Sequence, residues 1–381
     1  MVHPYQDSYT ISFEHLNDML NYHSKLAALS RWERTEVNNL KVEPLDEKSP
    51  FYNDLSSFHP DVMEDTVKDT ASNLGLAIWL TNHHYPVRDT AFKSLLDRAK
   101  IGGTSIPKLP RNVLANTLNE CLAIQKSAMA LLLVREQKVS AVHSGDERDY
   151  SILPIDKLLE GIKSKLNQRF SGNTFDGGYS DHALTSASWS LPSQTDDLLG
   201  SYHKTLAAQG KAALATKLTP GIRFSTSDTG VASAKVSALL LGLSYPIQIG
   251  GMVATEHRGK TTVEDFTNSL DMLFSQFEDS VRRLESLAAV YLEHPVNAMT
   301  AVCKKLSLPK KQALEAIAMF DMAYGGNTAT AHDVYFAMQE VMFMLKTENS
   351  PVSKMLILEE SMARALTLSW TQYDYAKAVI W

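Results

Sequence analysis

The stretch Lys217–Glu264, KLTPGIRFSTSDTGVASAKVSALLLGLSYPIQIGGMVATEHRGKTTVE, decides the fold of this chain of 381 residues. It holds two runs typical of β-strands, Gly221–Ser227 and Ile247–Thr255, and it ends where the longest predicted helix begins. Before it, strand-like and helical patterns mix along the chain. After Thr262 only a helical period continues. This change of period predicts an α+β fold, with a sheet drawn mainly from residues 130–260 and only helices beyond 262.

The same stretch contains a phosphate-loop look-alike, ATEHRGKT at Ala254–Thr261, between an apolar run and a helix. A phosphate loop wraps its ligand in backbone N–H groups, which requires glycine inside the loop. This loop has no interior glycine, and Glu256 would face the phosphates. We therefore interpret the segment as a strand end, a turn through Gly259 and a helix N-cap at Thr261 or Thr262. A nucleotide-binding enzyme is the weakest alternative.

Residues 1–110 are predicted to form an N-terminal helical region. Apolar residues at helical spacing predict an amphipathic helix within residues 5–35, and a polar, proline-containing loop follows over residues 35–60. A second helix is expected over Asp61–Asn82 and a short third one over Asp89–Ala99.

Residues 111–261 are predicted to form the sheet domain, with mostly antiparallel or mixed pairing. A helix over Arg111–Leu131 leads into a hairpin, because two β-rich runs, Ala130–Val134 and Val139–His143, are separated by a polar turn. A helix at Ile155–Leu166 and a strand at Ala183–Leu191 follow. With the two runs of the opening stretch, this pattern indicates about four to six strands.

Residues 262–381 are predicted to form a C-terminal helical bundle. Apolar residues recur at every seventh position, namely Val263, Leu270, Phe277, Leu284 and Tyr291. This spacing predicts one helix over residues 262–291 with a broad apolar face, roughly 40 Å long. Pro295 and Pro309 suit the first position of later helices, and Thr330 with Asp333 resembles a capping box.

Composition limits the classes of protein that the chain can represent. Hydrophobic residues make up 44% and charged residues 21%, as in soluble globular proteins, and the net charge is −6. A negative chain has no overall attraction to nucleic acid or to anionic membranes, so a nucleic-acid surface must be local. Cys121 and Cys303 lack any spacing typical of zinc sites or disulfides, which favours the cytoplasm. No signal peptide, membrane span or cofactor motif is expected.

The most basic run of the chain consists of four lysines: Lys304, Lys305, Lys310 and Lys311. No acidic residue lies between Pro295 and Lys311, and a turn at Ser307–Pro309 lets both pairs reach one phosphate backbone. We predict a nucleic-acid surface here, on DNA or RNA, and add Arg223 to it. The alternative is an ordinary solvated face.

Other polar residues suggest one further site and two weaker ones. His257, Arg258 and Lys260 precede a helix N-terminus and form a candidate anion site. Ser180–His182 has the residue types of a hydrolase triad, but a polar turn explains it as well. His83–His84 lacks a second group of ligands at metal spacing. The sequence therefore predicts no catalytic residue and no metal ligand.

Four blocks resemble a family of uncharacterised phage- and plasmid-encoded proteins, over roughly residues 110–370. The blocks are Leu132–Ser144, Pro220–Asp228, Glu256–Gly259 and Thr330–Glu340. The resemblance implies an origin on a mobile element, a bacterial host and an α+β fold. It implies no particular activity, because the family has none assigned.

Two functions of different class stand out. The first is an accessory protein of a phage or mobile element, with a non-catalytic, nucleic-acid-associated role in replication or recombination. A homo-oligomer is one form that it would take. The second is an interaction protein that inhibits a host defence or regulatory factor. We predict the first function, because of the resemblance and the basic run. The second is the alternative, because it explains the absence of catalytic signatures equally well.

Overall fold

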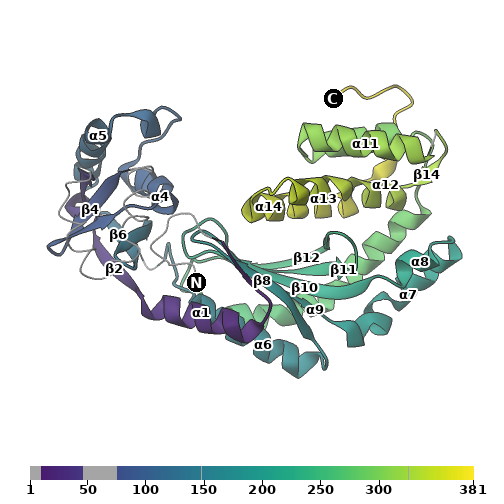
Figure 1. The fold of residues 1–381 in the computed structure, drawn as a ribbon, viewed down its shortest axis with the longest axis horizontal. Coiled ribbons are helices and arrows are strands. Elements are labelled where there is room, and N and C mark those ends of the chain that lie inside the picture. The colour runs from purple at the N-terminus through teal and green to yellow at the C-terminus, as the bar shows by residue number, and fades with distance from the viewer. Residues whose placement is uncertain (1–9, 46–74, 147, 325) are drawn as a thin grey trace.

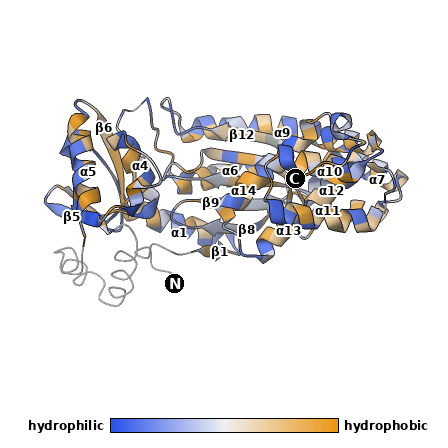
Figure 2. Ribbon diagram, turned by 90° about the horizontal axis from the view of Figure 1, so that it is seen from above, coloured by the Kyte–Doolittle hydropathy of each residue, from blue (hydrophilic) through white to orange (hydrophobic). Residues whose placement is uncertain are grey.

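The computed structural model describes residues 10–45, 75–146, 148–324 and 326–381. It has the predicted α+β fold, with several antiparallel sheets and a C-terminal helical region. A small lobe lies at one end of the long axis, and a larger lobe fills the rest (Figure 1, Figure 2). Each lobe has its own apolar core.

The large lobe is organised around a six-stranded sheet in which every neighbouring pair is antiparallel (Figure 1). The strand order is β1-β8-β9-β10-β11-β12. These strands are β1 (Ile11–Phe13), β8 (Thr174–Ser180), β9 (Thr185–Ser190), β10 (Thr219–Thr226), β11 (Ala234–Leu241) and β12 (Ile247–Thr255).

One face of this sheet is covered by helices from three parts of the chain. They are α1 (Leu16–Ala28), α6 (Ile155–Arg169), α7 (Thr195–Ala208), the short α8 (Ala212–Ala215) and α9 (Val263–Ser286). Helix α9 packs against β11 and β12, as its apolar stripe predicts. Its N-cap is Thr262, which forms a capping box with Asp265. Phe266 meets Phe224 of β10 edge to face, with ring centroids 5.8 Å apart.

The C-terminal helices cover the other face, so the sheet is the middle of three layers (Figure 1). They are α10 (Pro295–Lys305), α11 (Lys310–Tyr324), α12 (Ala331–Met338), α13 (Glu340–Thr347) and α14 (Val352–Ala363). Helix α14 lies against β12, and Tyr335 of α12 donates to the carbonyl oxygen of Gln248, 3.1 Å away.

The prediction that only helices follow residue 262 is wrong, although helices make up most of that region. Two short strands, β13 (Tyr291–Leu292) and β14 (Ala329–Thr330), pair antiparallel there. The chain leaving α9 runs beside the chain entering α12, and their backbone groups satisfy one another. Two-residue strands carry no periodic signal, so pattern analysis did not find them.

The described residues of the small lobe form two three-stranded antiparallel sheets and two α-helices. One sheet has the order β2-β6-β7 and the other β3-β4-β5. The elements are β2 (Ser30–Glu36), β3 (Lys41–Pro44), β4 (Leu76–Leu80), β5 (His83–Pro86), α4 (Asp89–Ala99), α5 (Arg111–Ile124), β6 (Met129–Arg135) and β7 (Lys138–Ser144). The predicted hairpin is confirmed as β6–β7. Glu136 and Gln137 form its turn with φ of 48° and 64°, as a two-residue hairpin requires.

The N-terminal helical region needs correction, because its described residues include five strands. The helix expected over residues 5–35 is α1 flanked by β1 and β2. Within Asp61–Asn82, residues 61–74 lie outside the described part of the chain, and residues 76–80 form β4. The apolar run of β4 is buried in the small lobe, where tertiary packing overrides a weak helical pattern.

We predict that Phe277→Ala destabilises the protein by about 3–5 kcal/mol, because the ring on α9 is 1% exposed in the core. Met272→Ala is the matched control on the same helix. Its side chain is 52% exposed, so its effect is expected within about 0.5 kcal/mol. Urea denaturation of both variants checks this. A loss below about 1 kcal/mol for Phe277→Ala would contradict the burial of the α9 stripe.

Candidate functional site

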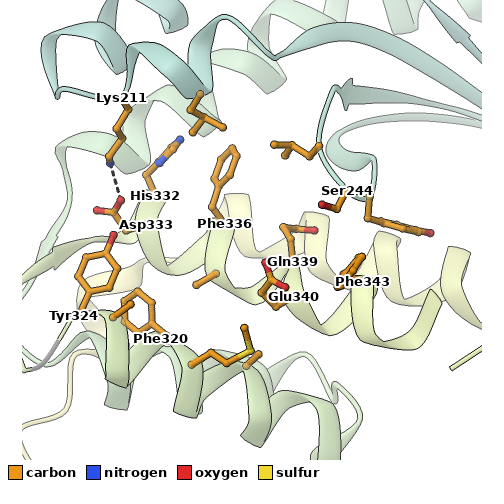
Figure 3. A pocket seen from close by; sticks show the side chains of 17 residues that line it. Lys211, Ser244, Phe320, Tyr324, His332, Asp333, Phe336, Gln339, Glu340 and Phe343 are labelled. Carbon is orange, nitrogen blue, oxygen red and sulfur yellow. Dashed lines mark ion pairs between the residues drawn. The ribbon is translucent and has the colours of Figure 1, made fainter. Parts of the chain in front are cut away.

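A cavity of about 430 Å³ opens between α11, α12, α13 and the turn that joins β11 to β12 (Figure 3). Its volume lies in the range of small-ligand sites. Five aromatic side chains line the wall: Tyr245, Phe320, Tyr324, Phe336 and Phe343. The polar groups of the wall include Lys211, Ser244, His332, Asp333, Gln339 and Glu340.

Local sequence explains why these side chains share one space. Phe336, Glu340 and Phe343 are spaced by four and three residues across the α12–α13 junction, so they fall on one face (Figure 3). The β11–β12 turn begins at Gly242, with φ of 98°. A Cβ atom there would lie 1.8 Å from the carbonyl oxygen of Lys217. Only glycine therefore allows the turn that carries Ser244 and Tyr245 to the cavity.

One end of the cavity is polar and internally paired. The Nζ atom of Lys211 lies 2.7 Å from Oδ1 of Asp333, which also caps α12 through Thr330. Burial acts to raise the pKa of Asp333, but the hydrogen bonds from Lys211 and Thr330 outweigh it and lower the pKa. The hydroxyl of Tyr324 points to the same carboxylate (Figure 3), and burial together with Asp333 raises its pKa to about 12. At this end of the cavity, the polar groups of Lys211, Tyr324 and Asp333 therefore interact with one another.

His332 is the most buried polar residue of the wall, at 1% exposure. Its Nε2 atom lies 2.6 Å from the hydroxyl oxygen of Tyr202, and its ring stacks on Phe336 with centroids 4.4 Å apart. Burial, with Lys211 nearby, lowers its pKa to about 4, so the imidazole is neutral at pH 7. Its Nδ1 atom has no hydrogen-bond partner among the described residues.

Glu340 differs from Asp333 in having no countercharge. No described residue forms an ion pair with it, although it lines the cavity together with the aromatic rings. Lys211 is the cation of the wall, and Asp333 already neutralises it. Among the residues that line the cavity, Glu340 therefore carries the one charge that no ion pair balances, and it lies next to aromatic faces.

The four lysines predicted to contact nucleic acid lie at the corner where α10 meets α11, and all four are exposed. Lys304 Nζ donates to the carbonyl oxygen of Ile380 at 2.5 Å, and Lys311 pairs with Glu348 at 2.8 Å. Glu348 lies 37 residues after Lys311 in the sequence. The lack of acidic residues near the lysines in the sequence therefore did not exclude this ion pair. Lys305 and Lys310 have no ion-pair partner among the described residues.

Arg223, predicted with the lysines, lies elsewhere. Its guanidinium is inside the large lobe on β10, where it pairs with Glu359 of α14. The hydroxyl of Tyr245 donates to the same carboxylate. Burial works against the charge on Arg223, but Glu359 overcomes this and raises its pKa. The side chain ties the sheet to the C-terminal helices instead of facing solvent.

The predicted anion-binding residues divide between solvent and the interior. Arg258 and Lys260 are exposed on the loop between β12 and α9, whereas His257 is half-buried. The N-terminus of α9 already carries its own carboxylates, Glu264 and Asp265. A phosphate loop also needs a parallel strand beside its own, and the six-stranded sheet is antiparallel throughout.

Sequence analysis missed a polar cluster that joins the two lobes, here named the interlobe cluster. Its members are His23, Arg135, His143, Tyr150, Asp228 and His257. Asp228, in the β10–β11 turn, pairs with Arg135 of the small lobe. Its carbonyl oxygen accepts from Nε2 of His143 at 2.9 Å and from the Tyr150 hydroxyl at 3.2 Å. Arg135 and His143 belong to the small lobe and Asp228 to the large lobe, so these contacts fasten the lobes together.

The aromatic members of the interlobe cluster are stacked. The rings of His143 and Tyr150 lie 3.7 Å apart and those of Tyr150 and His257 5.4 Å apart, each pair tilted by 12°. Three of the four sequence blocks quoted above contribute, through Arg135 and His143, Asp228, and His257. Each of these blocks contains conspicuous polar residues, but only the folded structure shows that the polar residues of different blocks contact one another.

The remaining polar motifs have structural partners. Asp181 accepts from the backbone N–H groups of Ala183 and Leu184, as a polar turn does, while His182 pairs with Arg88. His84 contacts Glu43 at 2.7 Å. Within the described ranges, no group of three or more histidine, cysteine or acidic residues is placed to hold a metal ion.

Comparison with known proteins yields no relative: no protein family, curated protein or solved structure matches this chain. In the part of the chain that the structure describes, no helix combines the length and the apolar character needed to cross a membrane.

We predict that the protein loses stability as pH falls below about 6.5. Burial lowers the pKa of His23 to about 3, of His143 to about 4, and that of His257 as well. The unfolded chain then binds more protons than the folded one as pH falls. Each histidine contributes a slope of up to about 1.4 kcal/mol per pH unit.

Urea denaturation at pH 7.5, 6.5 and 5.5 measures this slope. His23→Gln is expected to flatten it, whereas His15→Gln, which changes an exposed side chain near the start of α1, is expected to leave it unchanged. Equal stability at the three pH values would contradict the burial of these histidines as neutral rings.

Proposed function

We propose that this protein acts by binding, as an interaction protein, and that the cavity between α11 and α13 receives part of its ligand. The observation that carries the proposal is an aromatic cavity whose rim leaves large apolar side chains exposed. Met319 and Phe343 line the cavity and are 48% and 41% exposed. Exposed apolar surface beside a concavity is typical of binding sites.

The proposal agrees with the second function considered from the sequence, an interaction protein directed at a host factor. The resemblance to phage- and plasmid-encoded proteins supports an origin on a mobile element. Location in a bacterial cytoplasm and assembly into a homo-oligomer stay predictions. For the binding site itself, the support is the cavity and its rim.

A direct test uses 2-phenylethanol as a neutral aromatic probe, followed through methyl-labelled methionines by NMR. We expect the Met319 methyl signal to shift and saturate. Ala323→Trp should abolish the shift, because Ala323 lines the cavity and a tryptophan there fills it. Ala318→Trp is the matched control: Ala318 is an exposed alanine of the same helix outside the cavity wall.

The first measurement is the titration of the unmodified protein with 2-phenylethanol. If the Met319 signal does not move up to the solubility limit of the probe, the cavity is not a binding site. Equal loss in both tryptophan variants would also contradict the proposal, because it would place the effect outside the cavity.

Contact with nucleic acid is a second candidate function, favoured by the four exposed lysines at the α10–α11 corner. The protein is acidic overall, so a local cationic patch would have to neutralise the phosphates. Lys304 and Lys311 already have protein partners, which reduces the positive charge available to phosphates. The internal Arg223 is not part of this second proposal.

We predict that changing Lys304, Lys305, Lys310 and Lys311 together to Gln flattens the salt dependence of nucleic-acid binding. The slope of the logarithm of the affinity against the logarithm of the salt concentration should become shallower by about 2–4. Fluorescence anisotropy with single- and double-stranded oligonucleotides across a salt series measures it. The control replaces four scattered, exposed lysines: Lys93, Lys126, Lys204 and Lys217. An unchanged slope removes this patch, and no binding by the parent at low salt removes nucleic acid as a partner.

A further inference from the structure

We propose that the ligand of this cavity carries a positively charged organic group on an apolar stem, and that the carboxylate of Glu340 receives the charge. The group is an alkylammonium or guanidinium, either free or at the end of a lysine or arginine side chain of a partner. This inference rests on the proposed function, because it assigns a ligand chemistry to the same cavity.

The charge balance of the wall selects a cation. Lys211 and Asp333 cancel each other at one end, and His332 is a neutral ring. Glu340 remains, with no ion-pair partner among the described residues. A carboxylate that lines a partly enclosed space gains most from a bound cation, because water screens the pair less there.

The aromatic rings favour the same charge. Phe336 of α12 and Phe343 of α13 lie on either side of Glu340, and Phe320 of α11 lines the cavity beside Tyr324 (Figure 3). The face of an aromatic ring is negative and attracts ammonium and guanidinium groups. Tyr245 already shows this preference, since Nζ of Lys346 lies 6.0 Å from its ring centroid. Rings together with a carboxylate form the kind of site that holds organic cations.

The remaining surface suits an apolar stem and disfavours anions. Leu243, Ala316 and Met319 contribute aliphatic wall, and the flexible thioether of Met319 adapts to different shapes. An anion would be held by an unpaired cationic side chain or by free N–H donors at a helix N-terminus, and Lys211 is already paired with Asp333. At α12 the Asp333 carboxylate occupies that position, and at α13 Glu340 itself is the first residue. The cavity therefore selects against carboxylate and phosphate ligands.

The test compares three probes of similar shape at pH 7: 2-phenylethylamine, 2-phenylethanol and 3-phenylpropionate. The Met319 methyl signal reports binding of each. We expect the amine to bind roughly tenfold more tightly than the alcohol, and the carboxylate more weakly than either. Glu340→Gln should remove the advantage of the amine and leave the alcohol unchanged. Glu315→Gln, an exposed carboxylate on α11 outside the cavity wall, should preserve the advantage.

The outcomes separate this inference from the proposed function. If the alcohol binds and the amine binds no better, the cation assignment fails while the cavity remains a binding site. If no probe binds, the proposed function fails as well. An amine preference that survives Glu340→Gln overturns the role of Glu340.

A second comparison identifies the source of the cation. Pentylamine represents a free amine, and a blocked Ala-Ala-Lys-Ala-Ala peptide represents a lysine at a protein surface. Binding of both assigns a partner's side chain, and binding of pentylamine alone assigns a small molecule. Binding of neither, with 2-phenylethanol still bound, overturns the cation assignment.

Discussion

The requirement that the six-stranded sheet bury both of its faces determines how the rest of the large lobe is arranged. Helix α9 covers one face with a stripe that includes Phe266, Leu270 and Phe277. The C-terminal helices cover the other face through α12 and α14. Helices α12, α13 and α14 lie in one row next to the sheet, and α11 lies farther out (Figure 1). The aromatic cavity forms between α11 and this row (Figure 3).

Two of the ion pairs between distant parts of the chain are largely buried, and a further hydrogen-bonded group accompanies each of them. Arg223 and Glu359 join the sheet to α14, and the hydroxyl of Tyr245 completes that pair while its ring lines the cavity. Asp228 and Arg135 join the two lobes. Removing one partner of such a buried pair strands a charge, which costs about 3–5 kcal/mol. These side chains therefore position the lobes and the cavity wall.

Sequence patterns predicted the elements with strong periodicity. Helix α9, helix α6 and the β6–β7 hairpin were found, since each has a regular apolar pattern or a clear turn. The strands β8 and β11 were missed. The glycines of β8 hide its alternation, and β11 is a nearly continuous apolar run because both of its faces are buried. The cavity residues of α12 were noted only as a capping box and a helix, since no spacing marks a cavity.

The sequence by itself determined the α+β class, the long amphipathic helix and the helical C-terminal region, because local periodicity records which face of an element is buried. Only the tertiary structure decided which charges are free. Lys311 meets Glu348, Arg223 meets Glu359, and Glu340 meets no countercharge among the described residues. Ion pairing depends on distances of a few ångströms between elements far apart in the chain, and no pattern along the sequence encodes those distances.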